Sequence, residues 1–167
     1  DPDFSRNRYL YLYYTYSDSR NRLWNRVERF TEQNNRLNDP RIIIEGIPGA
    51  AIHDGGRIKF GPDSKLYITT GDSNQPDLSQ DLSSLAGKVL RLNSDGSIPG
   101  DNPFPGSPVY SYGHRNPQGL TWHPATGQLF ATEHGPTGFD EVNILLPGKN
   151  YGWPMLRGIA GRSPFVD

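Results

Sequence analysis

Two stretches of the chain decide the fold: GRIKFGPDSKLYITT at residues 56–70 and GLTWHPATGQLFAT at residues 119–132. In each stretch, strand-forming residues lie on both sides of a proline-containing turn, a pattern that predicts an antiparallel hairpin. The turn prolines, Pro62 and Pro124, lie 62 residues apart. Hairpins repeated at such intervals predict the blades of a β-propeller. Because a WD40 blade has only ~40–45 residues, each blade is expected to carry inserted loops, and a β-sandwich is the alternative fold.

Strand patterns continue towards the N-terminus. Residues 8–16 (RYLYLYYTY) are rich in aromatic residues that favour strands, residues 17–20 (SDSR) predict a turn, and residues 23–31 predict a returning strand. Residues 41–45 (RIIIE) predict a short buried strand. Only residues 78–85 could form a turn or two of helix. The expected fold class is therefore all-β.

The composition excludes several kinds of partner. The 17 basic and 18 acidic residues leave a net charge of −1, so no basic stripe indicates nucleic acid. No apolar run approaches the ~20 residues of a membrane-spanning helix. The absence of cysteine excludes disulfides and thiolate chemistry. A neutral or polar small molecule is the expected partner. The chain starts at Asp1 without a visible signal peptide, so either a secretion signal was removed or the chain is an internal fragment.

Hairpin geometry predicts where the polar residues meet. The residues that enter the first strand of a hairpin and those that leave the second lie at the same end. His53 and Asp72 should therefore share one end of the first unit, and residues 115–116 and 133–136 one end of the second. Blades around a common axis point the same way, so the two clusters should meet on one rim. His123, in the turn, should lie at the opposite end and have no function.

Three of these residues carry chemistry. His53 precedes two glycines in IHDGGR, and a histidine is the usual general base near neutral pH. Arg115 offers a fixed fork of donors for a carboxylate or a quinone oxygen, and Asn116 adds a donor and an acceptor. The structural alternatives are a loop histidine that caps a turn and an arginine that pairs with a nearby carboxylate. His114, between glycine and arginine, is expected to pack rather than react.

An acidic segment follows the second hairpin. It contains EHGP at residues 133–136, DE at residues 140–141 and NYGWP at residues 150–154. Hard cations such as Ca²⁺ take oxygen ligands, including the backbone carbonyls that a Gly-Pro step exposes. The alternative is an ordinary acidic loop. None of these segments has the spacing of a zinc site, a phosphate-binding loop or a nucleophile elbow.

Four long motifs together resemble one known family. They are HDGGRIKFGPDSKLYITTGD (53–72), LSSLAGKVLRLNSDGSIPGDNPF (82–104), YGHRNPQGL (112–120) and EHGPTGFDEVNIL…GKNYGWP (133–154). In this order they resemble the glucose/sorbosone dehydrogenase family, which includes the soluble sugar dehydrogenases that use pyrroloquinoline quinone (PQQ). The resemblance implies a six-bladed β-propeller of four-stranded antiparallel blades. Residues 1–167 would then form part of a single, truncated propeller domain, about half of the whole.

The resemblance also implies roles for individual residues. His53 would take the proton from the anomeric hydroxyl of the sugar, and Arg115 would stabilise the developing oxyanion of the quinone. The positions that would contact the quinone are Arg115, Asn116, His134, Gly135, Asp140 and Gln80, with Gln75 as the alternative to Gln80.

The resemblance further implies two calcium sites. The carbonyls of Gly135 and Pro136 would bind a Ca²⁺ that polarises the quinone. Glu141 and Tyr151 would bind a second, structural Ca²⁺. A further acidic ligand of that second ion would fall near Gly161, which cannot serve. The sequence therefore lacks one of the ligands that the resemblance implies for the second site.

The function that these features imply is PQQ-dependent oxidation of aldose sugars to lactones, with hydride transfer to the quinone, a histidine base and assistance from Ca²⁺. The partners would be a sugar and an external electron acceptor, and the location periplasmic or extracellular. A non-catalytic propeller that binds a protein or glycan is the alternative, and a propeller lactonase a weaker one. Because half a propeller exposes unpaired edges, the isolated chain is expected to be inactive and to pair with another copy or with a missing second half.

Overall fold

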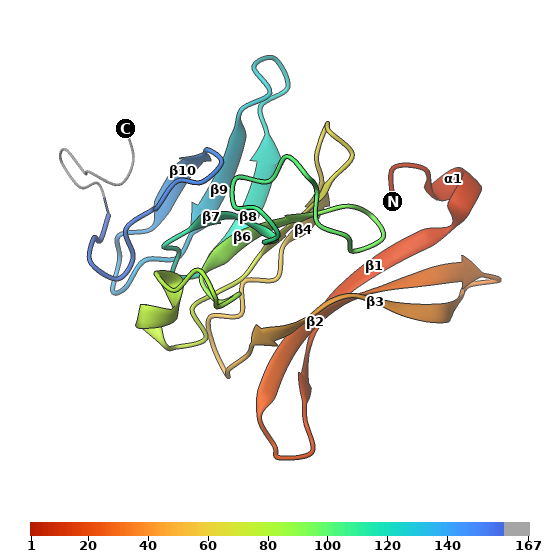
Figure 1. Ribbon diagram of the computed structural model, residues 1–167, viewed down its shortest axis with the longest axis horizontal. Coiled ribbons are helices and arrows are strands. Elements are labelled where there is room, and N and C mark those ends of the chain that lie inside the picture. Colours follow the sequence, from red (N-terminus) through yellow and green to blue (C-terminus); the bar gives the residue numbers. More distant parts are fainter. Residues whose placement is uncertain (159–167) are drawn as a thin grey trace.

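The computed structural model describes residues 1–158 of the 167-residue chain. This part forms three antiparallel sheets that follow one another across the molecule in chain order (Figure 1). The first sheet contains β1 (Tyr9–Ser17), β2 (Leu23–Gln33) and β3 (Arg36–Pro48); the second β4 (Ile58–Phe60), β5 (Leu66–Thr69), β6 (Lys88–Leu92) and β7 (Val109–Tyr112); the third β8 (Pro117–Trp122), β9 (Leu129–Glu133) and β10 (Glu141–Leu145). The all-β expectation is confirmed.

Both predicted hairpins are present as β4–β5 and β8–β9. Ile58 pairs with Ile68 in the first, and Trp122 pairs with Leu129 in the second. Each sheet is antiparallel and its strands are neighbours in sequence, an arrangement consistent with part of a β-propeller. The second sheet has four strands, whereas the first and third have three within residues 1–158. Six blades of four strands each therefore stay a prediction.

The core lies between the sheets, and the alternation along β5 explains how it forms. Leu66 and Ile68 face the first sheet and pack with Val27. Tyr67, on the opposite face of β5, packs with Leu120 of the third sheet. Side chains alternate across a strand, so a middle sheet buried on both faces needs apolar residues at consecutive positions.

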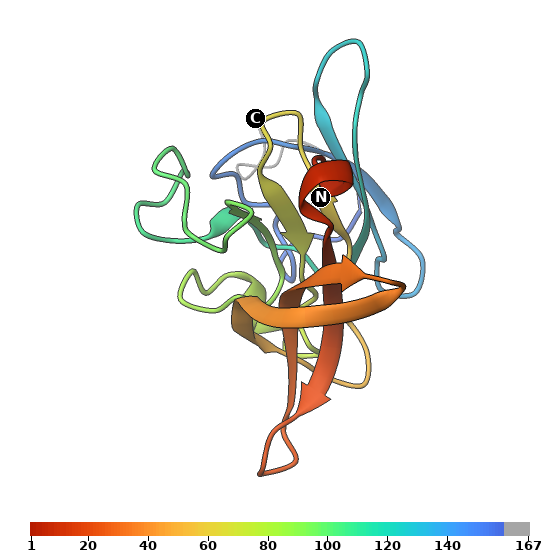
Figure 2. The same cartoon turned by 90° about the vertical axis from the view of Figure 1, so that its right-hand side faces the viewer.

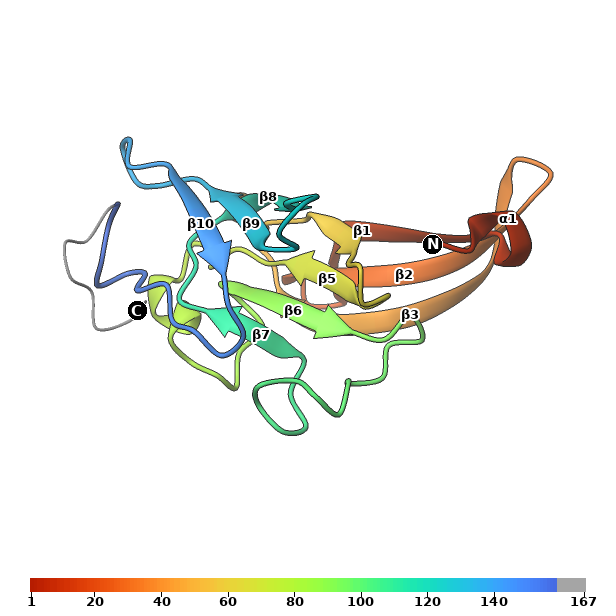
Figure 3. The same cartoon turned by 90° about the horizontal axis from the view of Figure 1, so that it is seen from above.

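The first strands of the three sheets lie side by side (Figure 3). On β4, Lys59 Nζ donates to Thr121 Oγ1 of β8 over 3.2 Å. Towards β1, the hydroxyl of Tyr13 donates to the carbonyl of Asp54, just before β4, over 2.6 Å. Strands that converge in this way bring the loops at one end of each sheet together. The candidate site lies at that end.

Two local expectations need correction. Residues 41–45 belong to the 13-residue strand β3 and are mostly exposed, with only Ile43 buried, because one face of β3 lacks a neighbouring sheet. The helix expected within residues 78–85 is instead the single 3₁₀ turn Pro76–Ser79, which overlaps the segment only at Leu78 and Ser79. It begins earlier than expected because proline favours the first turn of a helix. A four-residue helix, α1 (Phe4–Asn7), has no counterpart in the sequence reading.

The predicted turn between β1 and β2 is confirmed. Asp18 N–H donates to the carbonyl of Arg22 over 2.9 Å, and the turn extends away from the other two sheets (Figure 2).

Within residues 1–158, none of the helices has the length and apolar character needed to cross a membrane.

Candidate active site

The two polar clusters predicted to share one rim do so. Asp72, after β5, donates its backbone N–H to the carbonyl of Arg115 over 2.8 Å. The backbone N–H of Gly55 donates to Asn116 Oδ1 over 3.1 Å. His123 lies in the turn between β8 and β9, at the other end of that hairpin, where its Nδ1 accepts the N–H groups of the turn. The positional predictions for both ends are therefore confirmed.

His53 lies on this rim beside Asp72. Its side chain is 13% exposed, and its Nδ1 lies 2.8 Å from Asp72 Oδ1. The residue has a φ of +64°, a conformation that few residues other than glycine adopt. Gly71 makes room for this loop, because a Cβ at that position would lie 1.8 Å from the carbonyl oxygen of His53. The local backbone is therefore arranged around the imidazole.

A clamp from the first sheet holds the loop that carries His53. Asn25 of β2 is fully buried, and its Nδ2 donates to Asp54 Oδ1 over 2.8 Å. The same carboxylate oxygen accepts the backbone N–H of Ala50 over 3.0 Å, which closes the loop. Tyr13 donates to the carbonyl of Asp54, and burial raises the pKa of the Tyr13 hydroxyl. These contacts link the position of His53 to the first sheet.

Asp72 is fully buried and accepts three hydrogen bonds at its carboxylate. Its Oδ1 lies 2.8 Å from His53 Nδ1 and accepts the N–H of Asn74 over 2.9 Å. Its Oδ2 accepts the indole N–H of Trp153 over 2.8 Å. A buried carboxylate is stable only when such donors replace its hydration. The sequence reading did not identify Trp153, because a motif tryptophan carries no signal about a partner 81 residues away.

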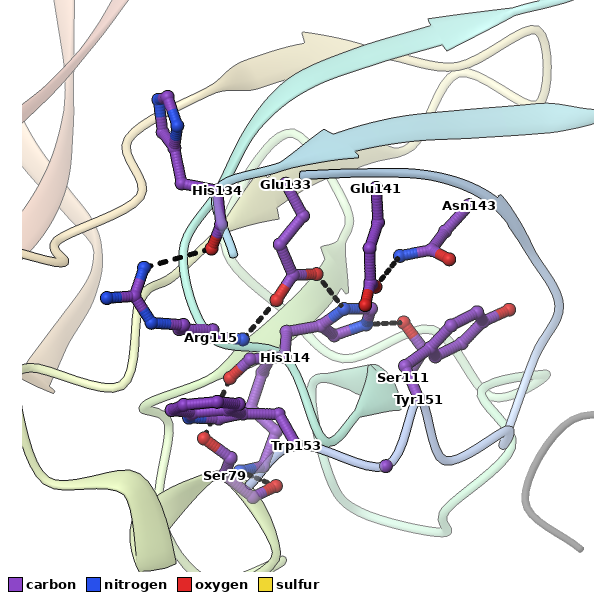
Figure 4. Close-up of polar contacts among 12 residues, drawn as sticks. Ser79, Ser111, His114, Arg115, Glu133, His134, Glu141, Asn143, Tyr151 and Trp153 are labelled. Carbon is purple, nitrogen blue, oxygen red and sulfur yellow. Dashed lines mark hydrogen bonds and ion pairs between the residues drawn. The ribbon is translucent and has the colours of Figure 1, made fainter. Parts of the chain in front are cut away.

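Arg115 lies beside this group and faces the segment after β9 (Figure 4). Its Nη1 donates to the carbonyls of His134 and Gly135 over 3.0 and 3.1 Å. Among residues 1–158, its buried Nε has no hydrogen-bond partner. The guanidinium carbon lies 5.5 Å from the centre of the Trp153 ring. Arg115 is thus a cation without a carboxylate partner in the described contacts, which suits an oxygen-rich anionic ligand.

His114, Glu133 and Ser111 form a buried chain of hydrogen bonds (Figure 4). His114 Nδ1 lies 2.9 Å from Glu133 Oε2, and its Nε2 lies 2.9 Å from Ser111 Oγ. Glu133 also accepts the backbone N–H of Arg115. The order of residues is that of a serine hydrolase triad, but Ser111 and His114 are 0% exposed, so no substrate can reach the hydroxyl. His114 packs, as expected, and the chain of bonds anchors Arg115.

His134 and Asp140 lie at the exposed side of the rim. His134 Nδ1 is 3.8 Å from Asp140 Oδ1, and their side chains are 57% and 71% exposed. Asp140 also accepts the N–H of Gly135 over 3.0 Å. A depression of about 230 Å³ is lined by Gln118, Thr132, Glu133, His134, Asp140, Glu141 and Val142. Because both side chains are exposed beside this depression, a ligand can reach them.

Gln80 is hydrogen-bonded to the segment that contains Asn150 and Trp153. Its Nε2 donates to Asn150 Oδ1 over 3.0 Å and to the carbonyl of Trp153 over 2.6 Å, and its Oε1 accepts from Asn150 Nδ2 over 2.7 Å. Since these bonds engage both ends of the amide, Gln80 fits a support for Trp153 better than a direct ligand contact. Gln75, the alternative position, is exposed.

The oxygen atoms suggested for calcium are partly engaged. The Gly135 carbonyl accepts from Arg115, and Glu141 accepts from Asn143 and from the N–H of Gly158. The Tyr151 hydroxyl donates to the carbonyl of Ile144 over 2.6 Å. Residues 1–158 contain no cluster of three or more metal-ligating side chains, and Gly161 lies outside the described residues. Ca²⁺ takes about six to eight oxygens, so the carbonyls of Gly135 and Pro136 do not by themselves make a calcium site.

Comparison with known proteins agrees with this architecture. Residues 1–161 match the family model described as Glucose / Sorbosone dehydrogenase. Quinoprotein glucose dehydrogenase B of Acinetobacter calcoaceticus is 38% identical over 99% of this chain and 40% of its own length. Aldose sugar dehydrogenase YliI of Escherichia coli is 38% identical over 92% of this chain and 44% of its own length.

The fold comparison gives the same answer. The structure of the PQQ-bound form of aldose sugar dehydrogenase from Streptomyces coelicolor superposes with a TM-score of 0.91 and 47% identity, over 99% of this chain and 49% of that one. This chain thus spans less than half the length of each of these relatives. With a family match over nearly its whole length, the chain belongs to the glucose/sorbosone dehydrogenase family.

Proposed function

We propose that the protein containing this chain oxidises aldose sugars to lactones and that His53 is the base. The observation that carries this proposal is the pairing of His53 Nδ1 with the buried Asp72 carboxylate, 2.8 Å away, on the rim that also holds Arg115. The carboxylate stabilises the imidazolium that forms when the other ring nitrogen takes a proton. The relatives named as quinoprotein and aldose sugar dehydrogenases support the same class of reaction.

PQQ is the cofactor that this proposal includes. When bound, it supplies the two-electron acceptor for the hydride that leaves the anomeric carbon. Arg115 suits its carboxylates and ring oxygens, since the guanidinium offers charged donors and a buried Nε without a partner among the described residues. Asn116, His134, Gly135 and Asp140 lie on the same rim and are proposed to surround the cofactor.

The oxidation removes one proton and one hydride from the sugar. His53 takes the proton of the anomeric hydroxyl at the nitrogen that does not face Asp72, while the hydride leaves the same carbon with its two electrons. The sugar becomes a lactone, and an external acceptor would then have to take the two electrons from the reduced cofactor. Calcium at the Gly135 and Pro136 carbonyls would need further oxygen ligands and stays a prediction, and the transfer of the proton and the hydride does not depend on it. A periplasmic or extracellular location stays a prediction.

The test is the variant His53→Gln in the full-length protein that contains this chain, with His123→Gln as the matched control in the β8–β9 turn. Dye reduction is followed with several aldoses after loading with PQQ and Ca²⁺. We expect loss of at least ~100-fold in kcat for His53→Gln and no change for the control. Undiminished activity in His53→Gln would contradict the assignment of the base. Failure of the unmodified protein to bind PQQ at equilibrium would favour a non-catalytic binding module.

A further inference from the structure

Trp153 contacts both groups on which the proposed reaction depends. Its indole N–H donates to Asp72 Oδ2 over 2.8 Å, and its ring face lies 5.5 Å from the guanidinium carbon of Arg115. We propose that Trp153 is a positioning residue that orients Asp72 and thereby selects the tautomer of His53 that can act as a base. This inference rests on the proposed function.

The hydrogen-bond geometry gives the reason. An ionised carboxylate only accepts hydrogen bonds, so His53 Nδ1 must carry a proton where it meets Asp72 Oδ1, 2.8 Å away. The lone pair then lies on Nε2, the nitrogen available to a substrate. Asp72 Oδ1 also accepts the N–H of Asn74 over 2.9 Å, and because Asp72 is fully buried its second oxygen, Oδ2, needs a donor from the protein. Trp153 supplies that donor at 2.8 Å, and it does so without exposing Asp72 to water.

Two hydrogen bonds hold the backbone of Trp153 in place. Its N–H donates to the carbonyl of Gly113 over 2.9 Å, and its carbonyl accepts from Gln80 Nε2 over 2.6 Å. Its side chain is nearly buried, with 9% of the residue exposed. Hydrogen bonds fix the backbone of Trp153, and Arg115 lies over the face of its ring. The indole therefore has little freedom to rotate, and its N–H stays directed at Asp72 Oδ2. The orientation of Asp72 is thus set by a segment that follows the third sheet.

A purely structural role would predict different behaviour. If Trp153 only fills space, Trp153→Phe should cost stability and leave the imidazole of His53 unchanged. The chain offers a matched control in Trp24, whose indole N–H donates to Asp18 Oδ2 over 3.1 Å in the distant β1–β2 turn. Trp24→Phe removes the same type of hydrogen bond away from the rim.

The first readout does not require activity. In the full-length protein without PQQ, the ¹⁵N chemical shifts of the His53 ring report which nitrogen carries the proton. We expect the Nδ1-protonated tautomer in the unmodified protein and in Trp24→Phe, and a mixture of tautomers in Trp153→Phe. An unchanged tautomer in Trp153→Phe would overturn the inference. If Trp153→Phe does not fold, benzothienylalanine at position 153, which keeps the ring shape and has sulfur in place of the N–H donor, provides the same comparison.

The second readout separates this inference from the proposed function. In the PQQ-loaded protein we expect Trp153→Phe to lower kcat by about 10- to 100-fold with a nearly unchanged KM for the sugar, because misplaced catalytic groups slow the step without weakening substrate binding. An increase in KM with an unchanged kcat would overturn the positioning role. If the unmodified protein shows no activity, the proposed function fails, whereas the tautomer measurement still decides the role of Trp153.

Discussion

Asn25 on β2 donates its amide to Asp54, the residue after the candidate base, over 2.8 Å. Asn25 Nδ2 also donates to the Pro48 carbonyl over 3.0 Å, and Asn25 Oδ1 accepts from Thr15 Oγ1 over 2.6 Å. Asn25→Ala removes three buried hydrogen bonds, although Asp54 Oδ1 keeps the N–H of Ala50 and the Pro48 carbonyl keeps the hydroxyl of Ser73. We expect a loss of about 1–3 kcal/mol in the free energy of unfolding, measured with urea.

Asn38→Ala is the control for that variant, since it removes one bond of 3.3 Å near the surface. It should change stability by no more than ~0.5 kcal/mol. Equal losses for the two variants would contradict the clamp on the His53 loop.

Glu133→Ala should destabilise the protein strongly. The substitution removes the acceptor for His114 Nδ1 and for the backbone N–H of Arg115, both at a buried site. Each orphaned donor costs about 1–3 kcal/mol, measurable by thermal or denaturant unfolding. Glu45→Ala removes a surface ion pair with Arg26 at 3.8 Å and should cost less than ~1 kcal/mol.

Ser111→Ala should leave sugar oxidation unchanged. Ser111 Oγ lies 2.9 Å from His114 Nε2, but both residues are fully buried. A nucleophile must reach its substrate, so the hydroxyl can only stabilise the imidazole. Steady-state kinetics of the variant is the measurement, and a large fall in kcat with unchanged stability would show that this group has access to the reaction.

Lys88 should make stability depend on pH. Its ammonium is fully buried and donates to the carbonyls of Leu78, Ser79 and Ala86 over 2.6 to 3.0 Å. Burial lowers its pKa to about 7 from the ordinary 10.5, so between these values the unfolded chain binds the proton that the folded chain lacks. The free energy of unfolding should therefore rise with pH in this window, by at most ~1.4 kcal/mol per unit.

Lys88→Met isolates that contribution, because methionine cannot titrate. Urea unfolding at a series of pH values should show a smaller rise than in the unmodified protein. Lys59→Met, which removes an exposed lysine bonded to Thr121, should retain the rise. Identical pH profiles for Lys88→Met and the unmodified protein would exclude Lys88 as the titrating group.

Arg115→Lys should weaken PQQ binding even though it keeps the charge. The Arg115 guanidinium contacts the carbonyls of His134 and Gly135 with one nitrogen and leaves others for a ligand, whereas an ammonium cannot form this fork. We expect Kd to rise at least ~10-fold in equilibrium titrations of the full-length protein. Arg57→Lys, which alters the bond from Arg57 Nε to the Gln118 carbonyl of β8, should bind PQQ normally.

The rim was predictable because hairpin geometry is local. The first strand of each predicted hairpin begins where the second ends, and this places His53 near Asp72 without knowledge of the rest of the fold. The strand at residues 41–45 was predicted less well. A run of isoleucines is buried throughout only if both faces of the strand meet a neighbour, and among residues 41–45 of β3 only Ile43 is buried.

The sequence by itself determined the family, the all-β class and the two ends of the β8–β9 hairpin, because these follow from motifs and from contacts between residues near in sequence. The tertiary structure decided what surrounds the candidate base. Trp153 meets Asp72 across 81 residues, and Asn25 meets Asp54 from another sheet. No periodicity encodes such pairs, because each depends on how three sheets pack and on which buried polar atoms must then find a partner.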